Sequence, residues 1–290
     1  MYEQLFWNSI VSGLLLALVA VGFSMIFNVA KVFHIAHGAV YAAGGYFFLW
    51  MHFILESSFV LSIIAVVLFT IVLSVLIENM VYKPLKIRNA GQAITLISSM
   101  GLYILIVNFI ALLFGNESKI AGYSILPSIE FLGLIVTQVQ LAQFILAILI
   151  LSLVYLFSRT QYCLQIRAVI SNEKVATVLG VNSKRIRLTA IVVGSLMAVA
   201  ACILKFYDSG IDPHAGMSIT LSAVVVVIIV GGFSVTGTIS AALMLSFIQT
   251  LTEWFFSSQW KEGITFGILI LVILWKTEGI VSHKMRIEET

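Results

Sequence analysis

The most regular pattern in this chain is a recurrence of apolar runs, each about twenty residues long, separated by short polar segments. A helical run of that length crosses the hydrocarbon core of a membrane, which is about 30 Å thick. The pattern therefore predicts an all-α polytopic membrane protein with about eight to ten transmembrane helices. The predicted spans are about 6–27, 38–54, 59–79, 92–114, 139–158, 188–205, 219–232, 238–256 and 263–279, of which the second and seventh are the weakest.

Two of these spans contain clustered glycines. A glycine weakens a helix by about 1 kcal/mol relative to alanine, and short glycine-interrupted spans in both halves of a chain are typical of an inverted repeat around a central pathway. We therefore expect broken or re-entrant helices beside such a pathway at 36–45 and 231–237. The alternative is that the glycines only allow neighbouring helices to pack closely. The candidate pathway residues are His37, Gly38, Gly44, Gly45, Asn108, Gly231, Gly232 and Gly237.

The stretch HIAHGAVYAAGGY, residues 34–46, also carries two histidines. His34 and His37 are three residues apart, a spacing that could place both imidazoles on one helix face. A metal site needs more ligands, and none lies within sequence reach, so we expect no metal. We expect His37 to form a hydrogen bond at the helix entry, near a cytoplasmic gate.

Basic residues are distributed unevenly between alternate loops. With the N-terminus outside, 13 of the 16 lysines and arginines fall in cytoplasmic segments, and only Lys119, Lys205 and Lys261 fall outside. Cytoplasmic loops of membrane proteins carry an excess of lysine and arginine. The charge pattern therefore predicts an outer N-terminus and an inner C-terminus, with 115–130 and 206–218 outside. The inner basic residues are Lys31, Lys83, Lys86, Arg88, Arg159, Arg167, Lys174, Lys184, Arg185, Arg187, Lys276, Lys284 and Arg286.

Composition agrees with a single transmembrane domain over 1–290. The chain is 61% hydrophobic and only 10% charged, with a mean hydropathy of +1.10. No polar stretch is long enough for a soluble domain, and the first apolar run is expected to be a retained helix rather than a signal peptide. Cys163 falls in a basic loop and Cys202 in an apolar run, so no disulfide is implied. The net charge of +3 reflects membrane topology, and no nucleic-acid-binding pattern is present.

Several function classes lack their sequence signatures. The chain has no Gly-x-x-x-x-Gly-Lys nucleotide-binding loop and no His-Glu-x-x-His metalloprotease motif. Ion-coupled carriers usually keep a charged group deep in the membrane, whereas the acidic residues here cluster at helix ends. The polar side chains within or near spans are amides: Asn8, Asn108, Gln143 and Gln249. We therefore expect a pore-forming transport subunit, not an enzyme, with no cofactor and with an external motor.

The longest predicted cytoplasmic loop contains a short helix at about 172–182. Asn172 is a plausible N-cap and Glu173 suits the first turn. Val175, Val178 and Leu179 share one face, Gly180 suits the end of the helix, and Ser183 could cap the next one. Two interpretations are open: a helix that lies on the surface of its own protein, or a docking helix that enters a groove on a partner.

This loop and three other segments resemble one family. RAVISNEKVATVLGVNSKRIRLTAIVVGSLMAVAA is similar to the coupling loop and following helix of the branched-chain amino-acid permeases of bacterial ABC importers. FSMIFNVAKVFHIAHGAVYAAGGY, VVVVIIVGGFSVTGTISAALML and ILILVILWKTEGI resemble further family segments, in the family's order. Five positions depart from the family pattern, which puts the substrate in doubt: His34, Ala39, Ser234, Thr238 and Thr277.

The resemblance implies a permease subunit of the bacterial inner membrane that forms the translocation pathway for branched-chain or similar small amino acids. It implies a second permease subunit, expected to be non-identical, two ATP-binding subunits below and a soluble substrate-binding protein above. Urea or short-chain amides are the alternative substrates, and a stand-alone channel or secondary carrier is the alternative class. The residues expected to couple to the ATPase are Glu173, Val175, Ala176, Val178, Leu179, Gly180 and Asn182.

Overall fold

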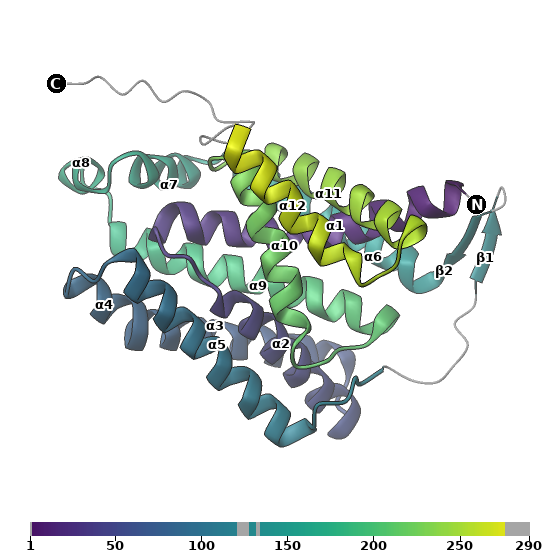
Figure 1. Ribbon diagram of the computed structural model, residues 1–290. Coiled ribbons are helices and arrows are strands. Elements are labelled where there is room, and N and C mark those ends of the chain that lie inside the picture. Colours follow the sequence, from purple (N-terminus) through teal and green to yellow (C-terminus); the bar gives the residue numbers. More distant parts are fainter. Residues whose placement is uncertain (1, 121–127, 132–133, 276–290) are drawn as a thin grey trace.

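A computed structural model describes residues 2–120, 128–131 and 134–275. The described chain is almost entirely helical (Figure 1). Its long helices are Tyr2–Ala30 (α1), Ala36–Leu49 (α2), Phe59–Ile77 (α3), Gln92–Phe114 (α5), Gln138–Phe157 (α6), Ser183–Ser209 (α9), Ala215–Val230 (α10), Val235–Phe255 (α11) and Trp260–Trp275 (α12). Each predicted span coincides with one of them; the end of the last, 276–279, lies outside the described residues.

Within the described residues, six helices are long and apolar enough to cross a membrane, and α10 is a shorter apolar helix. The prediction of an all-α polytopic membrane protein is thereby confirmed. The structure adds short elements that the apolar pattern did not predict. They are two π-helical turns, Trp50–Ile54 (η1) and Glu78–Tyr82 (η2), the helices Lys83–Ile87 (α4) and Gln161–Ser171 (α7), and an antiparallel hairpin of Ser128–Phe131 (β1) and Leu134–Thr137 (β2).

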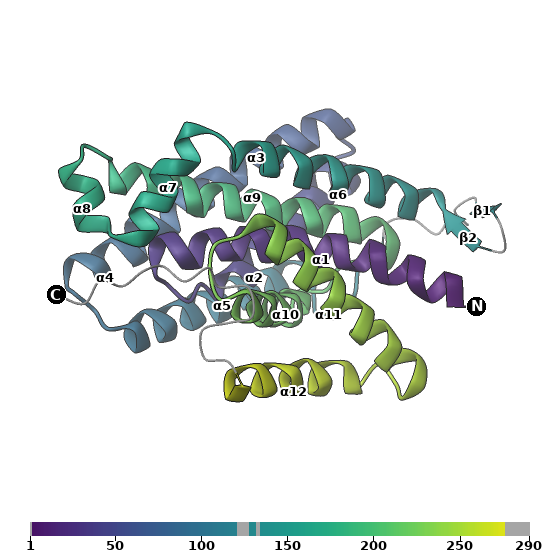
Figure 2. The same ribbon diagram turned by 90° about the horizontal axis from the view of Figure 1, so that it is seen from above.

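The bundle has two distinct ends (Figures 1 and 2). The short helices α4, α7 and Glu173–Val178 (α8) lie at one end, here called the basic end. The N-terminus and the hairpin β1–β2 lie at the other, the hairpin end. The segments predicted to be cytoplasmic and external therefore occupy opposite ends, as a transmembrane arrangement requires. Lys276, Lys284 and Arg286 lie outside the described residues.

Helix α1 runs through the middle of the bundle (Figure 2) and is buried along most of its length. It packs against α9, α10 and α11, while α2 packs against α5, α9 and α10. The peripheral helices α3, α5 and α6 expose most of their apolar residues. An apolar face of that size is stable in contact with lipid but not with water, which agrees with a membrane-embedded periphery.

Two helix pairs meet backbone to backbone. Gly22 of α1 faces Gly194 of α9, and Gly38 of α2 faces Gly216 of α10. A Cβ placed on any of these four would collide with the carbonyl group of its partner. Reciprocal contacts of this kind are a property of two-fold interfaces. Helix α9 comes five spans after α1, and α10 comes five spans after α2. Because five is odd, the second helix of each pair crosses the membrane in the opposite direction to the first. This is the relation expected between the two halves of an inverted repeat.

Polar caps begin several helices. The side chains of Ser58, Thr137 and Ser234 accept hydrogen bonds from backbone N–H groups in the first turns of α3, α6 and α11. Asn182 caps α9 by accepting from the N–H of Arg185 at 3.1 Å. The expectation that Ser183 is this cap is wrong, because its hydroxyl lies instead 2.7 Å from the hydroxyl of Thr177.

Candidate functional site

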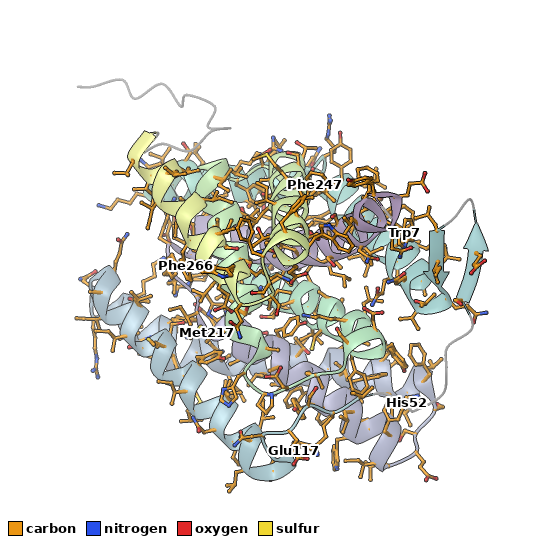
Figure 3. All side chains as sticks on the ribbon, turned by 45° about the vertical axis from the view of Figure 1, so that its right-hand side comes forward. Trp7, His52, Glu117, Met217, Phe247 and Phe266 are labelled. Atoms are coloured by element: carbon orange, nitrogen blue, oxygen red, sulfur yellow. The ribbon has the colours of Figure 1, made fainter. Side chains whose placement is uncertain are left out.

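A large open cavity lies toward the hairpin end of the bundle. Its volume is about 930 Å³, and it is bounded by α1, α6, α9, α10, α11 and the first turn of α12. The lining residues come from the first half of α1, the start of α6 and α10, and the last turns of α9 and α11. Trp7, labelled in Figure 3, stands at this end, where its indole N–H donates to Gln140 Oε1 at 3.2 Å. The cavity is therefore assembled from segments that are distant in the sequence.

Polar side chains form stripes on the helix faces that line the cavity. Each stripe follows the three- or four-residue spacing that places residues on one face of a helix. Most of the surrounding membrane helix surface is apolar, so these stripes mark a face that meets water or solute rather than lipid. The stripes are Gln4, Asn8 and Ser12 on α1; Ser218 and Ser222 on α10; and Ser246, Gln249, Thr250 and Glu253 on α11.

Hydrogen bonds hold several of these polar groups in place. The Gln249 amide nitrogen donates to Thr265 Oγ1 at 2.8 Å and to Ser222 Oγ at 3.2 Å, which joins α11 to α12 and α10. The Gln143 amide nitrogen donates to the carbonyl oxygen of Leu204 at 2.9 Å. The Ser246 hydroxyl donates to the carbonyl oxygen of Ser9 at 2.9 Å. These bonds preserve the shape of a polar wall inside an apolar bundle.

Charged side chains gather at the outer rim of this cavity. Lys261 Nζ lies 2.8 Å from Glu253 Oε1 and forms an ion pair with it. Lys205 and Asp208 near the end of α9, and Asp212 in the next loop, also line the cavity. Within the described part of the chain, these three form no ion pair. The rim thus offers both signs of charge to the cavity.

None of the candidate pathway residues lines this cavity. Helix α2 is continuous over Ala36–Leu49, so the break expected at 36–45 is absent. Its glycines lie at helix contacts: Gly38 faces Gly216, Gly44 faces the Val199 side chain, and Gly45 faces Cys202 and Ile211. In this structure they allow close packing, which was the alternative interpretation, and that packing stabilises the helix in spite of its three glycines. Whether this region borders the route in another state stays a prediction.

The second glycine segment does separate two helices. Gly231 ends α10 with φ +73°, a left-handed conformation that glycine adopts without strain. Gly232 follows in the connection to α11, and Gly237 in the first turn of α11 donates its N–H to Ser234 Oγ at 3.2 Å. The expected interruption at 231–237 is therefore present, between α10 and α11.

Asn108 lies on an exposed face of α5, where its amide donates to the carbonyl oxygen of Ile104 at 2.7 Å. The other three amides noted in the spans, Asn8, Gln143 and Gln249, all line the cavity. Polar neighbours on the same helix face would have distinguished Asn108 from the other amides. Asn108 stands alone among apolar residues, whereas Asn8 and Gln249 belong to polar stripes with helical spacing.

At the basic end, His34 rather than His37 makes the hydrogen bond at the entry to α2. His34 Nδ1 lies 2.5 Å from the Tyr82 hydroxyl, which donates to Ser99 Oγ at 3.0 Å. The backbone N–H of Ala36 donates to the same Ser99 oxygen. Burial, together with neighbouring His37, holds the pKa of His34 well below its usual value and keeps this imidazole neutral. His37 packs edge-on against Phe23.

The predicted coupling helix is α8, Glu173–Val178. The Asn172 side chain caps it by accepting from the N–H groups of Lys174 and Val175, at 3.0 and 3.1 Å. Gly180 follows with φ +88° and nothing within 4 Å of an added Cβ. The predicted N-cap at Asn172 is confirmed, and Gly180 has the left-handed conformation expected at the end of the helix.

The two faces of this helix differ sharply. Val175, Val178 and Leu179 are 53%, 86% and 77% exposed, so the predicted apolar face points away from the protein. Ala176, on the opposite face, is buried in a cluster with Met25, Ile166 and other apolar residues. Ala176 thus packs the helix against the rest of the protein and is not part of its exposed surface.

Two ion pairs connect the η2–α4 region to α8 and to the start of α9. Arg187 Nε in the first turns of α9 lies 2.9 Å from Glu78 Oε1 in η2, and both side chains are almost fully buried. Lys86 of α4 pairs with Glu173 at the start of α8, and this pair is exposed. The base of α8 is thus tied to the first half of the chain as well as to α9.

The comparisons with known proteins point to one family. The family model described as "Branched-chain amino acid transport system / permease component" matches residues 5–274. The "High-affinity branched-chain amino acid transport system permease protein LivH" of Salmonella typhimurium is 28% identical, over 97% of this chain and 96% of the relative. BraD of Pseudomonas aeruginosa, with the same description, is also 28% identical, over 97% and 96%.

A probable LivH permease of Methanocaldococcus jannaschii is 24% identical, over 92% of this chain and 86% of the relative. Among solved structures, PsaBC from Streptococcus pneumoniae in complex with Fab matches with a TM-score of 0.52 at 13% identity. That match covers 92% of this chain and 90% of the solved chain. At this identity the structural likeness speaks for the fold alone.

Proposed function

This chain belongs to the branched-chain amino acid transport permease family, and from that premise we propose that it is the membrane subunit of an ATP-driven importer of branched-chain or similar small amino acids. Its apolar helices and family make it a multi-pass protein of the bacterial inner membrane. The chain supplies the route, and the energy comes from separate ATP-binding subunits.

The observation that carries the proposal is the exposed apolar face of α8. Three neighbouring aliphatic side chains stand in water at the basic end, while the cap at Asn172 and the buried Ala176 hold their helix in place. Covering these side chains in a groove would bury roughly 200–300 Å² of apolar surface, worth about 5–7 kcal/mol before the costs of association. An exposed apolar face that is already held in place favours a docking helix over a helix that lies on its own protein.

The orientation follows from the charge distribution. The basic end, with α4, α7 and α8, faces the cytoplasm and the ATP-binding subunits. The cavity at the hairpin end faces outward and receives solute from a soluble substrate-binding protein. A second permease subunit, expected to be non-identical, completes the pathway.

Copurification tests this assignment directly. The chain is expressed together with ATP-binding subunits, a second permease and a substrate-binding protein of the same transporter family from its own organism, and the complex is isolated through a tag on this chain. We expect a stable complex whose ATPase activity rises when the binding protein carries a branched-chain amino acid. A chain that purifies alone and transports solute without ATP would instead be a stand-alone channel or carrier. ATPase activity that rises with urea or a short-chain amide, and not with a branched-chain amino acid, would identify those compounds as the substrates.

A further inference from the structure

The cavity at the hairpin end changes in character with depth. Its rim carries charged residues from the last turns of α9 and α11, from the loop after α9 and from the first turn of α12. Deeper along α1 its lining becomes aliphatic at Val11, Leu15 and Leu16, and Ile219 of α10 adds to this apolar part. Gly22 of α1 faces Gly194 of α9 and the two helices run antiparallel (Figure 2), so Lys205, eleven residues after Gly194, lies about level with Val11, and Leu15 is about 6 Å deeper. A solute entering from the hairpin end would meet charges first and an apolar floor afterwards.

The rim charges are not all neutralised by the protein. Glu253 and Lys261 satisfy one another as an ion pair. Lys205 is half-buried and Asp208 is exposed, and neither forms an ion pair in the described part of the chain. Asp212 accepts a hydrogen bond from the backbone N–H of His214 at 2.8 Å through one oxygen. Lys205 and Asp208 stand three residues apart on α9, so their Cβ atoms are about 5–6 Å apart.

We propose that this cavity contains a binding site for a zwitterionic α-amino acid with an aliphatic side chain, in which Lys205 binds the carboxylate, Asp208 and Asp212 bind the ammonium group, and Leu15, Leu16 and Ile219 contact the side chain. The site rests on the proposed transport function and adds the residues that recognise the solute within the membrane subunit.

Other classes of solute match the cavity less well. An inorganic anion would be attracted by Lys205 but repelled by the two aspartates. An inorganic cation would be attracted by the two aspartates but repelled by Lys205. Urea or a short amide would need neither the separated charges nor the aliphatic floor. An amino acid uses all three features together, because its two charges stand on one carbon and its side chain extends away from both.

The site is suited to brief occupancy. Lys205 and Asp212 are half-buried and Asp208 is exposed, so water partly screens their attraction for a solute. A transport site must bind its solute well enough to admit it and weakly enough to release it. The geometry thus agrees with a low-affinity station that accepts solute from the binding protein.

The test is protection of a cysteine inside the cavity. Ser12 lines the cavity and is exposed, whereas both native cysteines are buried. Ser12→Cys is introduced into the complete transporter in lipid nanodiscs, and its reaction with a hydrophilic maleimide is followed, with the parent transporter as background. We expect saturating L-leucine to slow labelling by about threefold or more, as a ligand does when it fills a site. Glu117→Cys, in the loop after α5 and outside the cavity, should not be protected.

Two analogues and four charge variants identify the contacts. Isoamylamine is leucine without its carboxylate and 4-methylpentanoate is leucine without its ammonium group, and neither should protect Ser12→Cys at the concentration at which leucine does. Lys205→Met and Asp208→Asn should each abolish protection, while Lys205→Arg should retain it. Lys119→Met removes an outer positive charge that does not line the cavity, and it should leave protection unchanged. A variant is folded if its Ser12→Cys labels without leucine at the same rate as Ser12→Cys in the otherwise unchanged transporter.

The outcomes separate the site from the transport function. Protection that survives in both Lys205→Met and Asp208→Asn, or equal protection by either analogue, overturns the site. ATP-dependent leucine uptake without any protection also overturns the site and leaves the transport function standing. Absence of both uptake and protection overturns both, and protection by urea but not by leucine overturns the amino-acid site in favour of a neutral solute.

Discussion

Gly22 of α1 and Gly194 of α9 touch through their backbones: a Cβ added to either would lie 2.6 Å from the carbonyl oxygen of the other. No side-chain rotation can relieve such a contact, because the obstructing atoms belong to the main chain. The two longest central helices therefore depend on glycine at this crossing, and the same is true of α2 and α10 at Gly38 and Gly216.

Gly22→Leu should destabilise the protein strongly. Inserting a side chain here forces α1 away from α9, and overpacking of this kind costs about 3 kcal/mol or more when backbone must move. Gly101→Leu is the matched control, since Gly101 lies in α5 with nothing within 4 Å of an added Cβ. Thermal unfolding of the purified chain in detergent should show a clearly lower midpoint for Gly22→Leu and a nearly unchanged midpoint for Gly101→Leu. Equal midpoints for the two variants would contradict the close contact.

Removing one member of the buried Glu78–Arg187 pair should be costly. Glu78→Gln leaves the Arg187 guanidinium buried without its counter-charge, at a cost of about 3–5 kcal/mol. The double variant Glu78→Gln with Arg187→Met removes both charges and should recover most of that loss. The free energy of unfolding of each variant, combined as a double-mutant cycle, gives the coupling between the two residues. A coupling near zero would show that the pair is not formed in the membrane.

Leu179→Asp should disconnect the ATP-binding subunits without disturbing the fold. The side chain is 77% exposed, so the free chain tolerates a charge there, but a charge buried in a partner groove without a counter-ion should cost several kcal/mol of docking. Ile87→Asp is a suitable control, because Ile87 is 71% exposed on neighbouring α4. ATPase stimulation by loaded binding protein should be lost in the first variant and retained in the second. Full stimulation and full subunit stoichiometry in Leu179→Asp would refute docking by α8.

Gly180→Ala should weaken the end of α8 by about 1–2 kcal/mol, because an L-residue with a side chain is strained at φ +88°. The added methyl group meets no atom within 4 Å, so the effect comes from the backbone alone. Gly180→Asn, which tolerates the left-handed conformation better, should restore most of the coupling efficiency. Stimulated ATPase activity that ranks glycine, then asparagine, then alanine would support this assignment, and equal activity in all three would exclude it.

Cysteine labelling in intact cells should establish the orientation. Glu117→Cys lies after α5 on the predicted outer side, and Val178→Cys lies on α8 at the basic end. A membrane-impermeant maleimide added outside should react with Glu117→Cys at once and with Val178→Cys only after the cells are opened. The reverse order would invert the assignment of both ends.

The spans, the cap at Asn172 and the apolar face of α8 could be predicted from the sequence because each depends on neighbours along the chain. Twenty apolar residues make a span wherever they occur, and Asn172 caps the two N–H groups that follow it. Valine and leucine at helical spacing share a face whatever lies beyond it. The same local reasoning placed a break at 36–45, where the helix instead continues, because its glycines are buried against other helices.

The cavity and the buried pair could not be predicted in the same way. Gln249 of α11 meets Ser222 of α10 and Thr265 of α12, and no periodicity says which helices adjoin. Glu78 appeared to be one acid among several at helix ends until the packing of η2 against α9 buried it beside Arg187.

The sequence by itself determined that this protein is a helical membrane protein, which loops share a side, and which apolar residues share one face of the short helix that became α8. Only the tertiary structure decided that polar stripes from α1, α10 and α11 converge with Lys205 and Asp208 around one cavity. The physical reason is that hydropathy and capping act over a few residues, whereas a cavity exists only where helices distant in sequence fail to close completely against one another.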